Sequence, residues 1–220
     1  MRNNKNEILI FSSSAAVYGN PKVDLVNEEH PKEPISPYGK SKLKCEEFLA
    51  TESSFANFNY CNLRYFNAAG ANNTAGIGEY RKPETHLIPL ILNSIRGINE
   101  PFIIYGNDYD TVDGTCVRDF IHVCDLVEAH FESFQKIKSE KSSFTYNLAN
   151  EKGFSVLEII KVCEKITKRK VNYSFSNRRE GDPPTLIADC QKARSEIFWN
   201  PSQSNIENII NTAWEWHKSI

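Results

Sequence analysis

The sequence predicts an α/β fold, in which part of a doubly wound parallel sheet is followed by a smaller α/β region. The apolar run Ile8 to Phe11 is typical of a parallel strand that is covered on both faces. Strand and helix patterns then alternate as far as Phe66. After Asn67 a loop-rich stretch with several glycines leads to further helices and short strands. This change of pattern indicates that a second region begins there.

The first part of the chain is expected to form strand, helix and strand. The strand 8–11 runs into a serine cluster, and a polar loop leads to a helix over about 38–54. Ser36 is expected to cap this helix, with Pro37 as its first residue. The next strand is expected over 59–66.

The second part is expected to contain four helices and three strands. A capping-box pattern, Ser155 with Glu158, predicts the start of one helix. In chain order, the expected ranges are helix 86–96, strand 102–105, helix 123–136, strand 144–148, helix 155–167, strand 171–175 and helix 206–218.

Two units follow from this order of elements. The first is expected to span 1–68 and to include a returning segment at about 115–150, because the strand 144–148 is expected to rejoin the main sheet. The second is expected to span 69–220.

Composition excludes several classes of partner. The chain has 220 residues, of which 40% are hydrophobic and 25% charged, which is ordinary globular usage. The net charge is −2 without a long basic run, and the apolar runs fall far short of the roughly 20 residues of a membrane span. We therefore expect neither nucleic acid nor membrane as a partner. The polar start, 1–6, precedes no signal-peptide segment, which indicates a cytoplasmic location.

The cysteines and histidines do not indicate a metal site. No CxxC pair occurs, and no histidine stands at metal-ligand spacing from a cysteine. His122 is expected to be a structural histidine at a junction between strand and helix. We expect reduced, mostly buried thiols at Cys45, Cys61, Cys116, Cys124, Cys163 and Cys190.

The stretch from Tyr38 to Lys42 carries the clearest chemistry. Residues four apart on a helix share a face, so the Lys42 ammonium is expected near the Tyr38 phenol, where it favours the ionised form. A pair like this on a helix is more often solvated and without chemistry. Here, however, Ser14 ends a strand, where open α/β sheets place their ligands. The combination predicts a redox tyrosine site.

The set Ser14, Tyr38 and Lys42 resembles the catalytic triad of the extended short-chain dehydrogenase/reductase superfamily. Within it, the chain is similar to the UDP-glucose 4-epimerases over almost its whole length. The stretches that carry this resemblance stand in the family's order and near its spacing, at 12–19, 36–42, 63–71, 105–123 and 178–182.

The resemblance implies a Rossmann-type sheet, NAD as cofactor, and UDP-glucose and UDP-galactose as substrates. The catalytic residues it implies are Tyr38, Lys42 and Ser14. The cofactor-binding residues it implies are Lys42, Tyr38, Tyr65, Ser12 and Ser13. For the UDP-sugar it implies Ser14, Asn67, His86, Leu87, Tyr105, Arg118, Phe120, Val156, Arg179, Asp182 and Leu186.

Residue chemistry supports part of this set and leaves part open. The planar fork of arginine suits a diphosphate, and Arg118 and Arg179 stand in separate motifs. For Arg118 the alternative is an ion pair with its neighbour Asp119. Some family members carry two asparagines where this chain has Thr85-His86, so the side-chain contact there stays open. For the three proposed uridine contacts, core packing is an equally good alternative; these are Tyr105, Phe120 and Val156.

The implied reaction interconverts the two hexoses through a 4-keto intermediate, as in galactose metabolism. Tyr38 would take the proton of the sugar 4-hydroxyl while a hydride moves from carbon 4 to NAD and returns to the opposite face. Leu186 stands where, by family analogy, a tyrosine excludes N-acetyl sugars and a small side chain admits them. Leucine is intermediate in size, so N-acetylated substrates stay open.

One part of the family pattern has no counterpart in this sequence. The family begins with a strand, a glycine-rich turn and a helix that holds the cofactor pyrophosphate, and no glycine triplet of that spacing occurs here. We therefore expect an N-terminally truncated epimerase, inactive alone, whose complete form is a homodimer. The helix from Tyr38 and the one around Leu90 are both candidates for the dimer interface.

Other interpretations stay open. A 4-epimerase for UDP-pentoses, UDP-uronates or UDP-N-acetylhexosamines would share these motifs. A nucleotide-sugar dehydratase would need acidic residues beside the serine loop, and Ala15 and Ala16 follow Ser14 instead. A non-catalytic truncated remnant that retains a UDP pocket is the third alternative.

Overall fold

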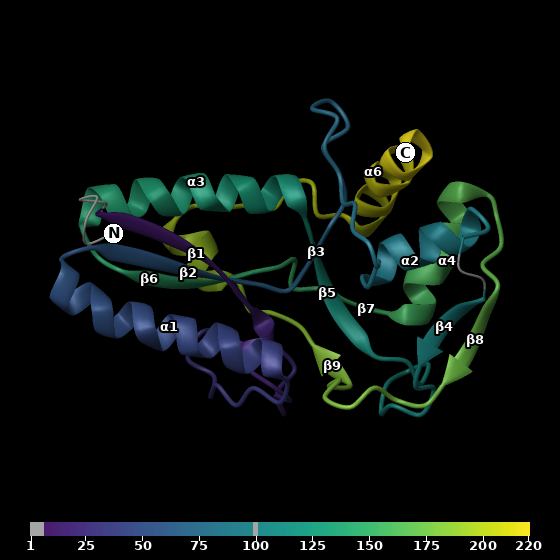
Figure 1. Cartoon of the computed structure of the whole chain (residues 1–220), viewed down its shortest axis with the longest axis horizontal. Helices are drawn as coiled ribbons and strands as arrows, with labels where there is room; N and C mark the ends of the chain where they lie inside the picture. Colours follow the sequence, from purple (N-terminus) through teal and green to yellow (C-terminus); the bar gives the residue numbers. More distant parts are fainter. Residues whose placement is uncertain (1–6, 99–100) are drawn as a thin grey trace.

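A parallel sheet between two long helices forms the first half of the molecule. The computed structural model describes residues 7–98 and 101–220, so the polar stretch 1–6 lies outside the described residues. Figure 1 shows the strands lying between one helix on each face. The sheet has the order β1-β2-β6, with every pairing parallel. Its strands are β1 (Ile8–Ser14), β2 (Asn59–Tyr65) and β6 (Phe144–Leu148), and its two covering helices are α1 (Pro37–Ala56) and α3 (Val123–Glu140).

This arrangement confirms the expected strand, helix and strand, and the return of 144–148 to the main sheet. Local chemistry explains where α1 begins. The Ser36 hydroxyl accepts a hydrogen bond from the Gly39 N–H, and Pro37 is the first helical residue, as expected. The first strand is longer than the apolar run, because the serines at 12–14 keep pairing with β2.

The core of this half recruits residues from late in the chain. Leu63 and Tyr146 from the sheet are completely buried, and they pack in one cluster with Ala188 and Trp199. The short helix α5 (Gln191–Glu196) lies in this segment. Residues 188–199, which are expected in the second unit, thus pack against the first sheet. The division into 1–68 and 69–220 stays a proposal.

A second sheet of short strands lies beside the first. Its central strand β5 pairs in parallel with β3 and β9 and antiparallel with β7. The sequence indicates one of these four strands, β5, through the junction between strand and helix expected at His122, where β5 ends and α3 begins. Three of them have only two or three residues, and the longest includes Arg118 and Asp119, so periodicity does not indicate them. They are β3 (Asn67–Ala69), β5 (Val117–His122), β7 (Gly153–Ser155) and β9 (Thr185–Leu186).

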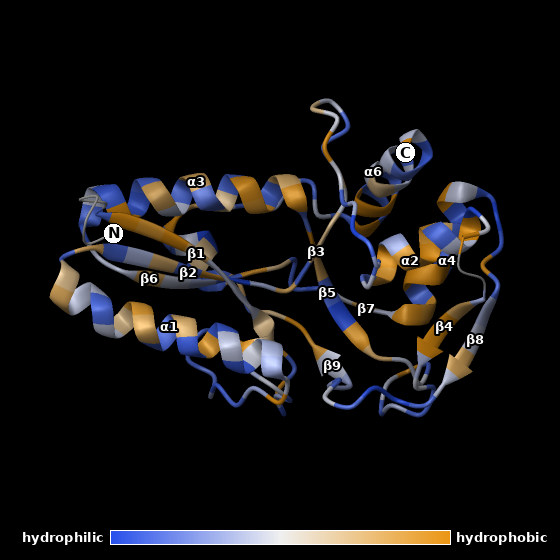
Figure 2. Ribbon diagram, viewed as in Figure 1, coloured by the Kyte–Doolittle hydropathy of each residue, from blue (hydrophilic) through white to orange (hydrophobic). Residues whose placement is uncertain are grey.

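Three helices and a two-stranded parallel ribbon complete the second half. Figure 2 shows hydrophobic stretches on all three helices, whose buried side chains form one apolar cluster with Phe102 and Ile104 of the ribbon. The helices are α2 (Leu87–Ile95), α4 (Val156–Thr167) and α6 (Ile206–Ser219); the ribbon is β4 (Phe102–Tyr105) with β8 (Tyr173–Ser176). The capping box of Ser155 and Glu158 is present as expected.

Two further expectations can be compared with the described residues. In that part of the chain, no helix combines the length and the apolar character that crossing a bilayer requires. The six cysteines are free thiols, but Cys45 is exposed and two others are only partly buried, so "mostly buried" holds for Cys61, Cys163 and Cys190 alone.

Candidate active site

Tyr38 and Lys42 lie on one face of α1, next to the end of β1. The Tyr38 side chain is 56% exposed. The Lys42 ammonium lies 5.5 Å from the centre of its ring and 5.1 Å from that of Phe11. It also donates a 2.8 Å hydrogen bond to the Ser12 carbonyl oxygen. The expected proximity of cation and phenol is therefore present, and the end of β1 holds the lysine in place.

A close backbone contact brings the start of α1 to Ser14. The Ser14 hydroxyl accepts a 3.2 Å hydrogen bond from the Ala16 N–H and caps the short 3-10 helix η1 (Ala15–Val17). Gly39 packs against this turn, and a Cβ atom there would lie 2.3 Å from the Ala16 carbonyl oxygen. Only glycine permits this approach, which places Tyr38 and Ser14 on the wall of one cavity.

Tyr65 joins β1 to α3 through a chain of hydrogen bonds. Its hydroxyl lies 2.9 Å from the Ser12 hydroxyl and 2.5 Å from Nε2 of His130. The other ring nitrogen of His130 lies 2.7 Å from the Leu126 carbonyl oxygen, to which only an N–H can donate. Burial raises the pKa of Tyr65 above its ordinary value, which keeps the phenol protonated. His130 leaves no signal in the sequence, because its partner is 65 residues away.

Ser13 faces the other side of the sheet from Ser12. It is buried, and its hydroxyl donates a 2.5 Å hydrogen bond to Glu46 of α1. A contact between the Ser13 hydroxyl and a cofactor would require breaking this bond. The cofactor role expected of Ser13 therefore stays a prediction.

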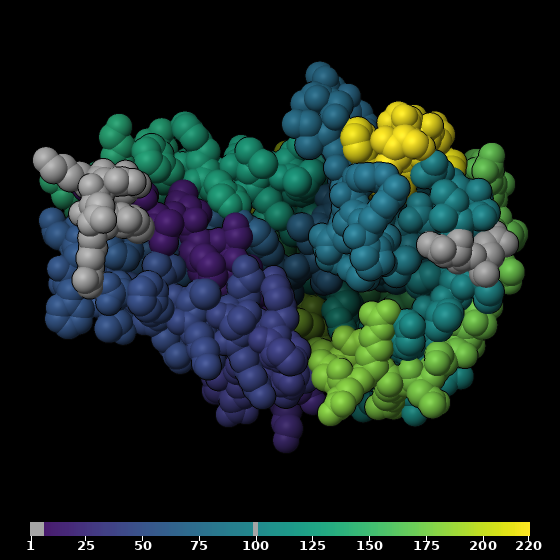
Figure 3. Space-filling model, viewed as in Figure 1, coloured from purple at the N-terminus to yellow at the C-terminus, as the bar shows by residue number. Residues whose placement is uncertain are grey.

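Three neighbouring cavities are lined by the other predicted site residues. Figure 3 shows that the surface is hollowed between the blue lobe and the lobe drawn in teal and green. We call the first the tyrosine cavity, of about 200 Å³; its walls include Ser13, Ser14, Tyr38, Tyr65 and Asn67. The aromatic cavity, also about 200 Å³, is lined by residues that include Asn67, His86, Leu87, Tyr105, Arg118, Phe120, Val156, Arg179 and Asp182.

The leucine cavity, of about 280 Å³, lies between these two groups of residues. Its walls include Ser14, Asn67, Arg118, Arg179 and Leu186. Leu186 is buried and sits on β9. Asn67 lines all three cavities, so the three spaces meet around the start of β3. The structure thus brings together the residues expected to bind a sugar nucleotide and those expected to carry the redox chemistry.

Arg118 reaches the cavities without pairing with its neighbour in sequence. Its guanidinium lies 3.4 Å from the Asp182 carboxylate and is 13% exposed. The alternative of an ion pair with Asp119 is wrong: the Asp119 carboxylate accepts backbone N–H bonds from Asn150 and Ala188 on the other side of β5. Burial raises the pKa of Asp119 to about 7. Asp119 also accepts a 2.7 Å bond at its carbonyl oxygen from the Asn67 side chain, which orients Asn67.

Arg179 and Arg178 have different surroundings. The Arg179 guanidinium stacks on Tyr105, with 3.9 Å from its central carbon to the ring centre. Arg178 stacks on Tyr109 and forms a 2.7 Å ion pair with Asp108. Arg179 lines two of the cavities, whereas Arg178 ties together the two loops beside β4 and β8.

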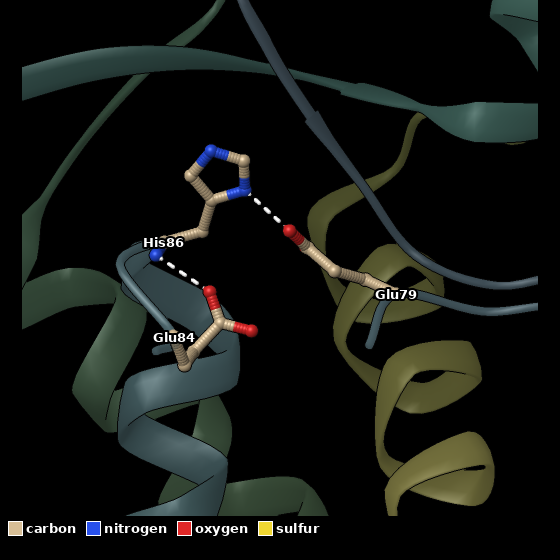
Figure 4. A group of neighbouring side chains, drawn as sticks. All are labelled: Glu79, Glu84 and His86. Carbon is tan, nitrogen blue, oxygen red and sulfur yellow. Dashed lines mark hydrogen bonds and ion pairs between the residues drawn. The ribbon is translucent and has the colours of Figure 1, made fainter. Parts of the chain in front are cut away.

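His86, at the start of α2, belongs to a cluster of hydrogen bonds with Glu79 and Glu84. Figure 4 shows the His86 ring directed at Glu79, with Nδ1 2.5 Å from the carboxylate oxygen. The Glu84 carboxylate accepts bonds from the backbone N–H groups of Thr85 and His86. Arg81 lies 3.3 Å from Glu79 and 3.9 Å from Glu84. The three ligand atoms are close enough to hold a metal ion, but each has a hydrogen-bond partner, and Arg81 lies near both carboxylates. The expectation of no metal stays a prediction.

A larger cavity of about 910 Å³ lies between α3 and the loop before α2. Val127 and Phe131 of α3 line one side, and Ile77 and Gly78 line another. Ala68 and Ala69 border both this space and the tyrosine cavity, so the two adjoin. No sequence pattern predicts this cavity, because its walls come from segments far apart in the chain.

Comparison with known proteins identifies the group to which these features belong. A parallel sheet that ends beside a serine and a Tyr-Lys helix is the architecture of the extended short-chain dehydrogenase/reductases, which defines the class. More narrowly, the chain belongs to the family described as GDP-mannose 4,6 dehydratase, whose family model matches residues 1–212.

Individual relatives are similar over nearly the whole chain. The UDP-glucose 4-epimerase of Lactobacillus helveticus is 44% identical over 96% of this chain and 64% of its own length. A solved structure described as UDP-glucose 4-epimerase is 44% identical, with a TM-score of 0.94, over 100% of this chain and 67% of that one. The UDP-glucose 4-epimerase of Bifidobacterium longum, solved with NAD+ and UDP, is 37% identical, with a TM-score of 0.94. The match covers 100% of this chain and 66% of that one. The chain thus spans 64% of the length of the Lactobacillus relative.

Proposed function

We propose that this protein interconverts UDP-glucose and UDP-galactose with NAD as cofactor, as a step of galactose metabolism. The observation that carries the proposal is that the three cavities share Asn67: Tyr38 and Ser14 line one of them, and Ser14 lines another together with Arg118 and Arg179. The similarity to proteins named UDP-glucose 4-epimerase, one of them solved with NAD+ and UDP, supports it.

The residues at the end of β1 fit the nicotinamide end of such a cofactor. An ammonium group has three N–H donors, and the described contact of Lys42 with Ser12 uses one of them, so others can reach ribose hydroxyls. Tyr38, Tyr65 and Ser12 add hydroxyl groups at the same edge. When bound, NAD would supply the hydride acceptor for sugar carbon 4 and would return the hydride afterwards.

The chain's own groups then have separate roles. Tyr38 removes the proton of the sugar 4-hydroxyl and later returns one, and Lys42 keeps positive charge beside the phenol ring. Ser14 donates a hydrogen bond to the reacting oxygen. Arg118 and Arg179 hold the diphosphate as a pivot, about which the 4-keto sugar turns to present its other face.

The aromatic cavity is assigned to the uridine. Phe120 and Val156 are buried, so they serve the core as well as the cavity wall. Tyr105 lies under the Arg179 guanidinium and can pack against the base only beside that stack. His86 and Leu87 border the same space, and Asp182 is placed to accept from a ribose hydroxyl while near Arg118.

We also propose that the side chain of Leu186 determines which sugars the substrate pocket accepts. A leucine at this wall leaves more room than a tyrosine would, so we expect UDP-N-acetylgalactosamine to be a slower substrate than UDP-galactose. Equal turnover of the two sugars would contradict the assignment of Leu186 as the residue that limits the pocket. Adding a UDP-pentose and a UDP-uronate to this comparison of substrates would detect a 4-epimerase for those sugars.

We further propose a homodimer in the cytoplasm. The outer face of α1 exposes Phe48 and Phe55, which is consistent with an interface on this helix. The helix around Leu90 is less suitable, because Ile91 and Leu92 are buried in the core of the second half.

Replacing Tyr38 by phenylalanine tests the proposed chemistry. In the native full-length protein, Tyr38→Phe should lower kcat for UDP-galactose by at least ~10²-fold, because general acid–base catalysis contributes about that much or more. Affinity for UDP should stay nearly unchanged, since the diphosphate site lies elsewhere. Tyr173→Phe, an equally conservative change on β8 outside the three cavities, is the control. Turnover like the wild type in Tyr38→Phe would refute the assignment.

A further inference from the structure

The helix that carries Tyr38 is held on the sheet by few buried side chains. Within α1 only Gly39, Glu46 and Leu49 are buried, with Leu43 partly buried beside them. Apolar contacts are not directional, so two leucines alone would let the helix slide or rotate on the strands. The third buried side chain is a carboxylate, which makes directional contacts instead.

Glu46 accepts hydrogen bonds from β1 and β2, the two strands that end at Ser14 and Tyr65. Arg64 of β2 donates to it with a two-pronged geometry, Nε to Oε1 at 2.9 Å and Nη2 to Oε2 at 2.7 Å. Ser13 of β1 donates to the same Oε1 atom at 2.5 Å. The Glu46 and Arg64 side chains are only 5% and 3% exposed. The carboxylate is thus bound from two strands at once.

The same network ties in the third strand. Arg64 also donates to the Tyr18 hydroxyl at 2.8 Å and to the Glu28 carbonyl oxygen at 3.1 Å. Tyr18 donates in turn to the Asn147 side chain of β6 at 2.6 Å. Every strand of the sheet therefore contributes a hydrogen-bonding group, and satisfied buried networks of this kind specify one arrangement.

A contribution to folding stability alone does not explain why the buried ion pair of Glu46 and Arg64 is present. Taking two charges out of water is costly, and well-packed apolar side chains often replace a buried ion pair without loss of stability. Apolar side chains, however, cannot make directional contacts that define how the helix is oriented on the sheet. Glu46 lies one turn beyond Lys42 and two turns beyond Tyr38 on the same face of α1, while its partners Ser13 and Arg64 adjoin Ser14 and Tyr65 in sequence.

We propose that Glu46 and Arg64 are positioning residues that fix α1 on β1 and β2, so that Tyr38 and Lys42 stand beside Ser14 and Ser12. The inference rests on the proposed function for its catalytic consequence, although the placement of the helix can be tested separately. Neither residue touches the three cavities, so their effect on turnover passes through the helix.

The test replaces the pair by apolar side chains in the native full-length protein. Glu46→Met with Arg64→Met should fold and melt within a few degrees of the wild type, but kcat for UDP-galactose should fall at least tenfold. The affinity for UDP should stay within about twofold, because the arginine pivot is untouched. A double variant with the kcat of the wild type would overturn the proposal.

A second variant covers the case in which the double variant does not fold. Arg64→Lys keeps the charge but lacks the planar fork that holds both carboxylate oxygens. We expect at least a tenfold loss in kcat with UDP affinity unchanged, whereas kcat within twofold of the wild type would contradict us. The matched control is Glu151→Met with Arg194→Met, an ion pair remote from α1, which should keep kcat.

Amide hydrogen exchange separates the two proposals. In Arg64→Lys, the amides of α1 should exchange at least tenfold faster than in the wild type, while those of α4 should not change. Unchanged exchange in α1 would overturn the positioning role whatever the activity. If the wild-type protein binds NAD and UDP but does not turn over UDP-galactose, the proposed epimerase function is wrong. The exchange rates of the α1 amides would then still test whether Glu46 and Arg64 position the helix.

Discussion

Three arginines, one on β5 and two in the loop after β8, differ in what their side chains contact. Arg118 is largely buried beside Asp182 and lines two cavities, Arg179 lies flat on Tyr105, and Arg178 is taken up by Asp108 and Tyr109. Sequence motifs identify the first two as candidates for a diphosphate. The contacts explain why the third, adjacent in sequence, is a poor candidate.

Replacing these arginines one at a time should reveal that difference. Arg118→Met should raise the Kd for UDP by ~10-fold to ~100-fold, because a hydrogen bond to a charged group contributes about 1.5–3 kcal/mol. Arg178→Met, the matched control, should change it by less than about threefold. Isothermal titration of UDP into each variant measures both. Equal losses in the two variants would mean that the cavity walls do not select the ligand.

Single-residue expectations succeeded where the relevant contact is local. Tyr38 and Lys42 could be placed together because a helix puts residues four apart on one face. The partner of Arg118 could not, since Asp182 is distant in sequence and adjacent Asp119 was the obvious alternative. The direction of the side chains along β5 explains why Arg118 pairs with Asp182 and not with Asp119, because neighbouring residues on a strand point to opposite faces of the sheet.

At the level of elements, α1 begins where its sequence predicts and lies where its tertiary contacts allow. Ser36 and Pro37 define its first turn through local hydrogen bonding and backbone geometry. Its approach to β1 depends on Gly39, because the backbone of Ala16 occupies the space of a side chain there. Residues next to its start thus determine where α1 begins, whereas contacts with segments distant in the sequence determine where it lies.

Gly39→Ala should separate these two effects. Alanine favours a helix by about 1 kcal/mol over glycine, but its Cβ would lie 2.3 Å from the Ala16 carbonyl oxygen, so the first turn must shift. We expect kcat to fall at least ~10-fold with only a small change in melting temperature. Thr51→Ala, at an exposed position of α1, is the control. A Gly39→Ala protein with full kcat would contradict this account of how Tyr38 is placed.

At the scale of the whole molecule, Asp119 links the two halves. Its carboxylate binds the backbone N–H groups of Asn150, after β6, and Ala188, after β9, while its own strand β5 belongs to the second sheet. The side chain is completely buried, and its pKa is raised from 3.8 to about 7 by that burial. The folded protein therefore binds a proton here more tightly than the unfolded chain.

A dependence of stability on pH follows from this. The folded state gains from protonation of Asp119, so its contribution is fully present below pH ~4 and is lost as the pH rises through about 7. A shift of about three pKa units corresponds to about 4 kcal/mol. Asn does not titrate, so the unfolding free energy of Asp119→Asn, relative to the wild type, should increase between pH 4 and pH 8.

Urea unfolding of both proteins at several pH values measures this difference. Comparing the two proteins removes the opposing contribution of His122 and His217, whose pKa values are lowered by burial in both. A difference that does not change between pH 4 and pH 8 would contradict the role assigned to Asp119.

The sequence by itself determined the α/β class, the strand, helix and strand at the start, the caps of α1 and α4, and the proximity of Tyr38 and Lys42 on one helix. All of these depend on periodicity or on contacts within a few residues, which leave a readable local pattern. Only the tertiary structure decided that residues 188–199 complete the first core, that short strands surround β5, that His130 meets Tyr65, and that Glu46 pairs with Arg64. Those contacts join segments distant in the chain, and their geometry exists only once the sheet has assembled.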